Sequence, residues 1–354
     1  MDPSPVKKLA YKSNPNGLDN QAPIDLRNIQ SVPEAHTWEK PEPHTITMES
    51  IPVIDITDPN AKLLIGEACE KWGAFQAINH GIPSHLFDKA EAETFRLFNL
   101  PHDHKLRVLR GPDDVLGYGI PRIQRYFPKF MWSEGFTIEG SPAQHASELW
   151  PDQPHIQTAF CTTMEECQKE MKRATESVME LIFGALGLGP KDEKWPKSKM
   201  GDNKAQALLA LNSYPMCPEP DRAMGLGPHT DTSFVTVVHQ SSCTGLQLLK
   251  EGVGWVPVKP VRGALVVNVG DLLHILSNGR FHSVFHRAVV NNEKHRVSIA
   301  YVYGPPSDVK IAPAPTMIDQ EHPPLYSPVT WNHYIYAKSI HHNNALEYVK
   351  HRVQ

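Results

Sequence analysis

PHTDTSFVTVVHQ, at residues 228–240, joins a polar motif to a run of β-branched residues. The run Ser233–His239 predicts a strand because it is short, apolar and rich in valine. Similar runs, separated by Gly, Pro, Asn or Asp, recur at Ala205–Ser213, Leu246–Leu249, Trp255–Val258, Ala264–Val269, Ala288–Val290 and Val297–Tyr303. This spacing is typical of an antiparallel β-sandwich or barrel.

The residues that flank this region predict helices and a few strands. Ile51–Ile56 and Gly73–Asn79 are predicted strands, and residues 111–160 are expected to be irregular with short strands. Apolar spacing predicts helices at Ala61–Trp72 and Thr162–Leu188. Helices are also predicted at Ile82–Phe98, Pro101–Leu109 and Val329–His342, and a short one near Pro33–Trp38. The longest of these begins with Thr162 or Thr163 and has Glu165 or Glu166 three residues on, the pattern of a capping box.

Together these segments predict a mainly β chain with flanking helices, organised in four parts. An N-terminal arm spans 1–48, and a mixed α/β region spans 49–200. The β core spans 201–305, and a C-terminal segment with its helix spans 306–354.

Composition and charge narrow the classes of function. Hydrophobic residues make up 40% and charged residues 21%, which excludes a fully disordered chain. The net charge of −4 provides no basic field, so we expect no nucleic-acid partner. No apolar stretch suits a membrane span or a secretory signal, so we expect no membrane partner. The five cysteines include no CxxC pair, which fits free thiols and predicts a cytoplasmic protein.

His229 and Asp231 stand two residues apart, just before the predicted strand of the opening segment. Residues i and i+2 of an extended chain face the same side, so the imidazole and the carboxylate can act together. One further histidine would complete the two-histidine, one-carboxylate triad that suits non-haem Fe(II) oxygenases. The His-x-Asp pattern alone is weak, because short motifs of this kind often lie in surface turns.

Three histidines in GDLLHILSNGRFHSVFHRAVV, residues 270–290, are candidates for the third ligand. His274 lies in an apolar, turn-like segment, where packing or a surface role is expected. His282 and His286 share strand parity, so alternation of side chains does not separate them.

Arg296 and Ser298 share one face of the next predicted strand by the same two-residue period. A guanidinium fork and a hydroxyl suit a carboxylate ligand. With His286 as the third ligand, the histidine follows Asp231 by 55 residues and the Arg-x-Ser motif follows by 10 more. This order is more specific than any of its parts and predicts an iron site and a carboxylate anchor in one barrel.

The whole pattern resembles the plant Fe(II)- and 2-oxoglutarate-dependent dioxygenases, whose core is a double-stranded β-helix, or jelly roll. The resemblance extends from about Ile51 to the C-terminus. It rests on IPVIDI (51–56), WGAFQAINHGIP (72–83), LNSYPMCPEPD (211–221), PHTD (228–231), GLQL (245–248), VVNVGDLLHILSNG (266–279), FHRA (285–288) and RVS (296–298).

The resemblance implies which residues bind the metal. His229, Asp231 and His286 are the implied ligands of Fe(II), so the family pattern selects His286 among the three histidines. Ascorbate is implied as a supporting reductant.

The resemblance also implies how 2-oxoglutarate is bound. Arg296 and Ser298 are the implied partners of its distal carboxylate, and Tyr214 and Asn212 match two further co-substrate residues. The family usually has Tyr between Asn212 and Tyr214, where this chain has Ser213.

Three segments resemble the gibberellin 3-oxidase branch: LGYGIPRIQRYF (116–127), FPKFMWSEGFTIEGSP (127–142) and EPDRAMGLGPHTD (219–231). This branch implies 3-beta-hydroxylation of inactive gibberellin precursors to bioactive gibberellins, with O2 and 2-oxoglutarate consumed and succinate and CO2 released. The alternative is the same chemistry at the 2-beta position, or at both positions.

Two functions of other classes fit the sequence less well. A binding module derived from such an enzyme would be expected to have lost a metal ligand or Arg296, and all four are present. A zinc hydrolase could use the same ligands, but nothing in its chemistry calls for Arg296 and Ser298.

The diterpenoid substrate needs an apolar wall and a partner for its carboxylate. Tyr118, Phe127 and Trp132, with Ile120 and Phe130, are expected to form the wall. Arg122 is the favoured cation, ahead of Arg125 and Lys129, and Tyr334 and Tyr336 of the last helix are expected to close over the top.

Overall fold

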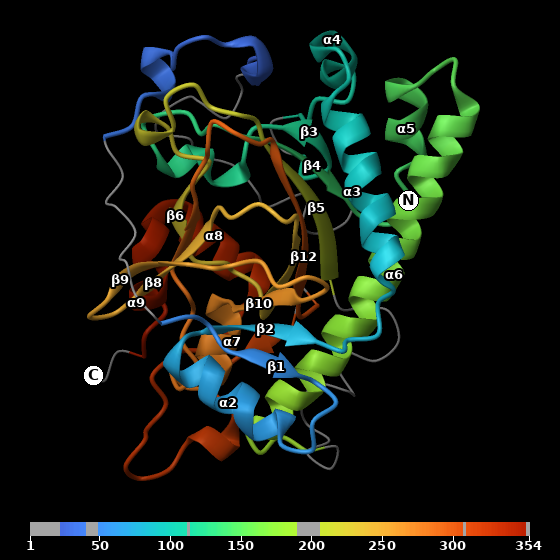
Figure 1. Ribbon diagram of the computed structural model, residues 1–354. Coiled ribbons are helices and arrows are strands. Elements are labelled where there is room, and N and C mark those ends of the chain that lie inside the picture. The colour runs from blue at the N-terminus through green and yellow to red at the C-terminus, as the bar shows by residue number, and fades with distance from the viewer. Residues whose placement is uncertain (1–21, 40–48, 112–113, 190–205, 307–308, 352–354) are drawn as a thin grey trace.

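Two β-sheets dominate the computed structural model (Figure 1), which describes residues 22–39, 49–111, 114–189, 206–306 and 309–351. The larger sheet has eight strands in the order β1-β2-β10-β7-β12-β5-β4-β3, and the smaller has four in the order β6-β11-β8-β9.

The strands of the larger sheet are β1 (Val53–Asp55), β2 (Ala74–Ile78), β3 (Gly117–Gly119), β4 (Glu134–Ile138), β5 (Gln206–Tyr214), β7 (Val235–Gln240), β10 (Leu265–Val269) and β12 (Arg296–Gly304). Those of the smaller sheet are β6 (Leu226–His229), β8 (Leu246–Lys250), β9 (Gly254–Pro257) and β11 (His286–Ala288). A two-stranded sheet joins β13 (Lys310–Ile311) to β14 (Val329–Thr330).

The two large sheets face each other across a buried apolar layer. Val238 of β7 and Ala300 of β12 lie in one cluster with Leu246 and Leu248 of β8. Because side chains alternate along a strand, the residues between these point the other way, to the outer faces. The strands of the larger sheet that contribute to this layer, β2, β5, β7, β10 and β12, therefore have an inner face toward the smaller sheet and an outer face toward the helices.

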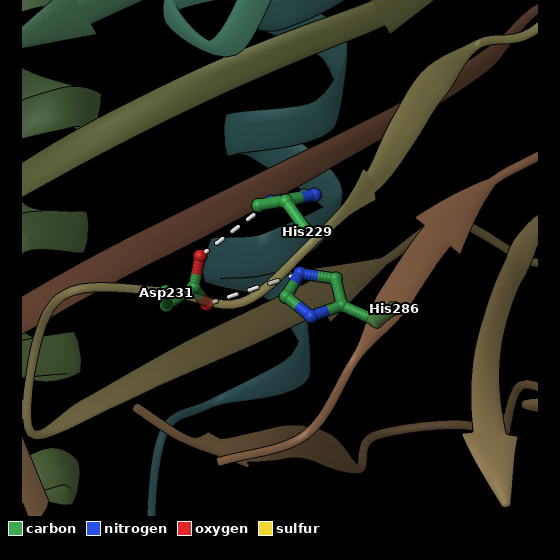
Figure 2. A group of neighbouring side chains, drawn as sticks. All are labelled: His229, Asp231 and His286. Carbon is green, nitrogen blue, oxygen red and sulfur yellow. Dashed lines mark ion pairs between the residues drawn. The ribbon is translucent and has the colours of Figure 1, made fainter. Parts of the chain in front are cut away.

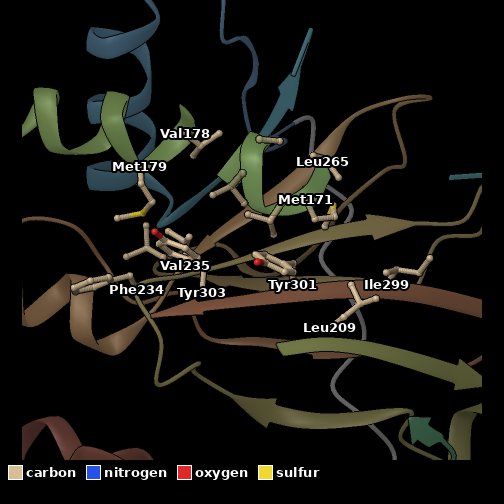
Figure 3. Packing of buried hydrophobic residues seen from close by; sticks show 14 of the residues in the cluster. Met171, Val178, Met179, Leu209, Phe234, Val235, Leu265, Ile299, Tyr301 and Tyr303 are labelled. Atoms are coloured by element: carbon tan, nitrogen blue, oxygen red, sulfur yellow. The ribbon is translucent and has the colours of Figure 1, made fainter. Parts of the chain in front are cut away.

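Three helices cover the outer face of the larger sheet: α2 (Ala61–Lys71), α3 (Ser84–Phe98) and α6 (Pro154–Ala185). Figure 3 shows Met171 and Val178 of α6 in one cluster with Ile299 and Tyr301 of β12. The remaining helices are α4 (His102–Leu106), α5 (Ala143–Leu149), α7 (Asp271–Leu276), α8 (Trp331–His341), α9 (Ala345–Tyr348), and the 3₁₀-helices η2 (Leu26–Asn28), η3 (Glu34–His36), η4 (Arg122–Tyr126), η5 (Pro220–Arg222), η6 (Pro315–Met317) and η7 (His342–Asn344).

The prediction of a mainly β chain with flanking helices is confirmed, and every predicted run between residues 206 and 303 overlaps a strand. The predicted start of the longest helix is wrong. Helix α6 begins at Pro154, where a missing N–H costs nothing at the first helical position, so Thr162 and Thr163 lie inside it. Two smaller differences are β14, which occupies the start of the predicted last helix, and α7, which replaces a predicted turn-like segment.

The four-part division of the chain stays a prediction, since residues 1–21, 40–48 and 190–205 lie outside the described residues. Strands β1 to β4 of the region 49–200 belong to the same sheet as β5, β7, β10 and β12. Across the part of the chain that is described, no helix combines the length and the apolar character needed to cross a membrane.

Candidate active site

Two neighbouring strands of the smaller sheet bring together two histidines. His229 is the last residue of β6 and His286 the first of β11, and the two are directly paired across this antiparallel ladder. Paired residues point to the same face, and the two ring centroids lie 4.2 Å apart. Leu248 of β8 is also paired with His286 and lies in the layer between the sheets, so the histidines face inward.

Asp231 completes the group from the connection between β6 and β7 (Figure 2). Its Oδ1 lies 3.6 Å from Nε2 of His229, and its Oδ2 lies 3.9 Å from Nε2 of His286. One possible ligand atom from each residue lies within 4.8 Å of the other two. These separations suit three atoms arranged around one metal ion.

The hydrogen bonds of the two rings fix which nitrogen is free to bind a metal. Nδ1 of His229 lies 2.8 Å from the carbonyl oxygen of Gly227, and Nδ1 of His286 lies 3.1 Å from that of Val284. A carbonyl only accepts, so each Nδ1 carries the proton and each neutral ring turns the lone pair of Nε2 toward Asp231. Lone pairs that face a carboxylate repel it unless a cation lies between them.

Burial and charge keep these groups in the forms that bind metal. Burial lowers the pKa of His286 to about 4, so the ring is neutral at neutral pH. Burial alone would raise the pKa of Asp231, but positive charge placed beside the carboxylate when His286 or His229 is protonated lowers that pKa below its ordinary value, so Asp231 is ionised at neutral pH. Oδ2 of Asp231 is buried and has no hydrogen-bond partner among the described residues. The donor set therefore fits Fe(II).

The other two candidate histidines lie elsewhere. His274 is bonded through both ring nitrogens, to the carbonyl oxygen of Phe281 at 2.7 Å and to the hydroxyl of Tyr326 at 2.8 Å. The side chain of His282 is exposed. Of the three, the structure brings His286 to His229 and Asp231, a choice that strand parity left open.

The predicted co-substrate residues lie on the larger sheet, across from the triad. Arg296 is paired with Tyr214, and Ser298 is paired with Asn212, on the adjacent strands β12 and β5. Ser298 stands two residues before Ala300 of the inner layer, so both side chains point to the same, inner face. Nδ2 of Asn212 lies 3.4 Å from Oγ of Ser298, and the Arg296 guanidinium carbon lies 4.9 Å from the Tyr214 ring centroid.

Arg296 has the features of an anion-binding residue. Its side chain is buried, and its Nε has no hydrogen-bond partner in the described ranges of the chain. A buried charge without a partner is costly, so this site favours a carboxylate ligand. A glycine gives the side chain its room, because a Cβ on Gly245 would lie 2.8 Å from both Cδ and Nε of Arg296.

Gln240 was missed by sequence reasoning. It ends β7 and is paired with Ser298, so it shares the inner face. It is buried, and both atoms of its amide lack a hydrogen-bond partner within the described residues. One indication of this position is present in the sequence: Gln240 is a polar residue two places after Val238, so it is expected on the same face of the strand.

Of the residues predicted for the substrate, Tyr118, Arg122, Phe127 and Trp132 lie in different surroundings. The ring of Phe127 packs on Gly227, two residues before His229, so Phe127 does lie beside the metal-binding strand. Trp132 is fully buried in an apolar cluster that also holds Tyr214 of β5 and Ala288 of β11, and its ring N–H donates to the Met216 carbonyl oxygen at 3.3 Å. Arg122 begins η4 and is half-buried.

Tyr118 lies on the opposite face of the larger sheet from the predicted co-substrate residues. It is paired with Phe136, which is in turn paired with Leu211, so these three side chains share one face. Leu211 and Asn212 are neighbours on β5, so Asn212 points to the other face. Its hydroxyl donates to Oε2 of Glu134 at 2.5 Å, in a buried network on the helix side. The structure therefore does not bring Tyr118 to the face that carries Arg296 and Ser298.

The two tyrosines of α8 that were expected to close over the substrate differ in their surroundings. The hydroxyl of Tyr334 is buried and donates to Asp271 at 2.8 Å. Tyr336, on the same helix, is 46% exposed.

Comparison with known proteins places this site in a family. Residues 205–305 match the model of the 2OG-Fe(II) oxygenase superfamily, and residues 51–153 match that of the non-haem dioxygenase in morphine synthesis N-terminal region. A solved structure of JOX2 in complex with 2OG, Fe and JA is 30% identical, with a TM-score of 0.77 over 93% of this chain and 98% of that one. A rice dioxygenase for auxin oxidation is 26% identical, with a TM-score of 0.68 over 85% of this chain and 100% of that one.

Fold and site together define an Fe(II)- and 2-oxoglutarate-dependent oxygenase, as the sequence predicted. The double-stranded β-helix fold class and the two cofactors are confirmed with it.

Curated relatives narrow the family. Gibberellin 3-beta-dioxygenase 1 of Pisum sativum is 46% identical over 98% of this chain and 94% of that protein. Gibberellin 3-beta-dioxygenase 3 of Arabidopsis thaliana is 43% identical over 95% of this chain and 97% of that protein. The chain belongs to the gibberellin 3-beta-dioxygenase family.

Proposed function

We propose that this chain hydroxylates a gibberellin at the 3-beta position and so converts an inactive precursor to a bioactive hormone. The observation that carries the proposal is the joint one: near full-length similarity to gibberellin 3-beta-dioxygenases and a complete metal-binding triad. A substrate C–H bond becomes C–OH. One oxygen atom of O2 enters that hydroxyl and the other enters succinate, while 2-oxoglutarate loses CO2.

His229, Asp231 and His286 are the proposed ligands of Fe(II). The carbonyls of Gly227 and Val284 orient the two rings so that Nε2 of each points to the metal position. Fe(II), when bound, supplies the activation of O2 that this oxidation requires. The three ligands leave coordination positions open for co-substrate and O2.

Arg296 and Ser298 are the proposed partners of the distal carboxylate of 2-oxoglutarate. Asn212 and Tyr214 lie next to them on β5, and Gln240 lies next to Ser298 on β7. The guanidinium provides a bidentate match, and its burial excludes the water that would weaken it. The inner face of the larger sheet thus holds the co-substrate opposite the metal.

The substrate is proposed to lie along the segment that precedes β4. Phe127 supports this position because its ring packs on the metal-binding strand at Gly227. Arg122, at the start of η4, remains the proposed partner of the gibberellin carboxylate. All five cysteines lie among the described residues and are free thiols, which supports the proposed cytoplasmic location.

The test is an incubation of the purified chain with a 3-deoxy gibberellin, Fe(II), ascorbate and 2-oxoglutarate. Mass spectrometry against standards identifies the hydroxylated position, and succinate is measured in parallel. We expect one hydroxyl at the 3-beta position and one succinate for each hydroxyl formed. Hydroxylation at the 2-beta position, or at both, would establish the alternative instead. The Asp231→Ala variant is the matched control and should form neither product.

A further inference from the structure

A buried ion pair lies directly behind the loop that carries Asp231. Asp271, the first residue of α7, is fully buried, and its Oδ2 lies 2.8 Å from Nζ of Lys338 on α8. The same carboxylate accepts from Tyr334 at 2.8 Å and from Ser283 at 2.5 Å. The charge of Asp271 is thus satisfied by donors from two separate segments, helix α8 and the stretch that precedes β11.

This pair holds the residue between two proposed metal ligands. The hydroxyl of Thr230 donates to Oδ2 of Asp271 at 3.1 Å and accepts from Nζ of Lys338. The backbone N–H of Asp271 donates to the carbonyl oxygen of Asp231 at 2.8 Å. The next residue provides a third attachment, because the ring N–H of Trp331 donates to the Thr232 hydroxyl at 3.1 Å. Residues 230–232 are therefore fixed at three consecutive positions.

Asp231 needs such support more than the histidines do. His229 and His286 lie on paired strands, and a carbonyl bond fixes each ring. Asp231 lies in the connection between β6 and β7, outside both strands, and its Oδ2 has no partner elsewhere in the described chain. No strand ladder sets its position.

We propose that Thr230, Asp271, Lys338 and Trp331 position Asp231 for the metal, so that the C-terminal helix α8 is part of the metal site. This inference rests on the proposed metal-binding role of the triad. Partners one step behind a ligand orient it, and their loss typically weakens metal affinity about 10- to 100-fold. Lys338 is a positioning residue and not a substrate partner, because its ammonium is buried and already bonds two oxygens.

The test measures metal affinity rather than turnover. Mn(II) is titrated calorimetrically into the metal-free full-length chain, without 2-oxoglutarate or gibberellin. Thr230→Val keeps the shape of the side chain and removes its hydroxyl, and we expect Mn(II) to bind about tenfold more weakly or worse. Thr230→Ser restores the hydroxyl and should restore the affinity.

Two further variants separate positioning from general stability. Trp331→Phe removes the indole N–H at a second attachment and should also weaken Mn(II) binding. Ser339→Ala lies on the same helix beside Lys338, and the bond of its hydroxyl, 2.7 Å to the Tyr336 carbonyl oxygen, stays within the helix. It should bind Mn(II) like the unmodified chain. Melting temperatures of the metal-free forms are compared in parallel.

The outcomes distinguish this inference from the proposed function. If the unmodified chain binds Mn(II) and Thr230→Val binds it equally well, with only the melting temperature lowered, the cluster is structural and the inference fails. If Asp231→Ala binds Mn(II) as tightly as the unmodified chain, the proposed triad itself fails.

Discussion

Two buried lysine–carboxylate pairs lie behind the site, and they differ in what they hold. Lys338 and Asp271 contact the loop that carries Asp231. Lys105 and Glu134, 2.6 Å apart, lie on the outer face of the larger sheet. Glu134 is paired with Ser213, between the two proposed co-substrate residues of β5.

The difference follows from the backbone on which each functional residue lies. Asn212, Tyr214 and Ser298 belong to paired strands, so the ladder places them without help from the pair behind. Asp231 lies on a loop and needs side-chain anchors. We therefore expect the buried ion pair to contribute to function at the metal end and to stability alone at the co-substrate end.

The largest expected effect is at the metal end. His286→Ala removes a proposed ligand, and turnover should fall to background because two remaining ligands hold a divalent ion poorly. His282→Ala removes an exposed imidazole from the same segment and should keep most activity. Succinate release from both variants measures this. An inactive His282→Ala with an active His286→Ala would reverse the ligand assignment.

Breaking the second ion pair should cost stability without touching the metal. Lys105→Met leaves Glu134 buried without its cation, which should lower the free energy of unfolding by ~3–5 kcal/mol. Urea denaturation measures the loss, and Mn(II) titration of the folded variant should give the affinity of the unmodified chain. A weakened Mn(II) affinity would mean that the two pairs do not differ as described.

Arg296→Lys should act on the co-substrate alone. Lysine keeps the charge but loses the planar fork, and a charge-assisted bond contributes about 1.5–3 kcal/mol, so the KM for 2-oxoglutarate should rise roughly ten- to hundredfold. The KM for the gibberellin should change little. Equal increases in both constants would indicate that Arg296 supports the barrel instead.

The smallest effect is expected at Gln240. Gln240→Leu has a similar size and removes two polar atoms that await a partner, so the KM for 2-oxoglutarate should rise by a factor that corresponds to about 1 kcal/mol. Mn(II) affinity should stay unchanged, since Gln240 lies across from the triad. A lower KM would show that the unpaired amide opposes co-substrate binding.

Local pattern explains what the sequence predicted well. The two-residue period of strands placed Arg296 with Ser298, and the family pattern selected His286. The same period could not predict that Tyr118 faces outward, because its strand has only three residues, too few to show an alternating pattern. The start of α6 was misplaced because an internal Thr–Glu pair mimics a cap.

The anchoring of Asp231 lay beyond sequence reasoning. Lys338 stands far along the chain from Thr230, and a lysine on a helix gives no sign of being buried. Asp271 opens a short helix whose sequence suggested only a turn. Such contacts arise from the packing of α8 against the loop, which no local period encodes.

The strand order of the larger sheet also protects the molecule from aggregation. Strands β2 and β4, both from the first half of the chain, pair with β10 and β5 and occupy what would otherwise be open edges. The true rims are β1 and β3, which have only three residues each and offer little template for another chain. Cut down to residues 205–305, the chain would present the nine-residue strand β5 and the valine-rich β10 as bare edges. The first half of the chain thus keeps the site-bearing half from pairing with copies of itself.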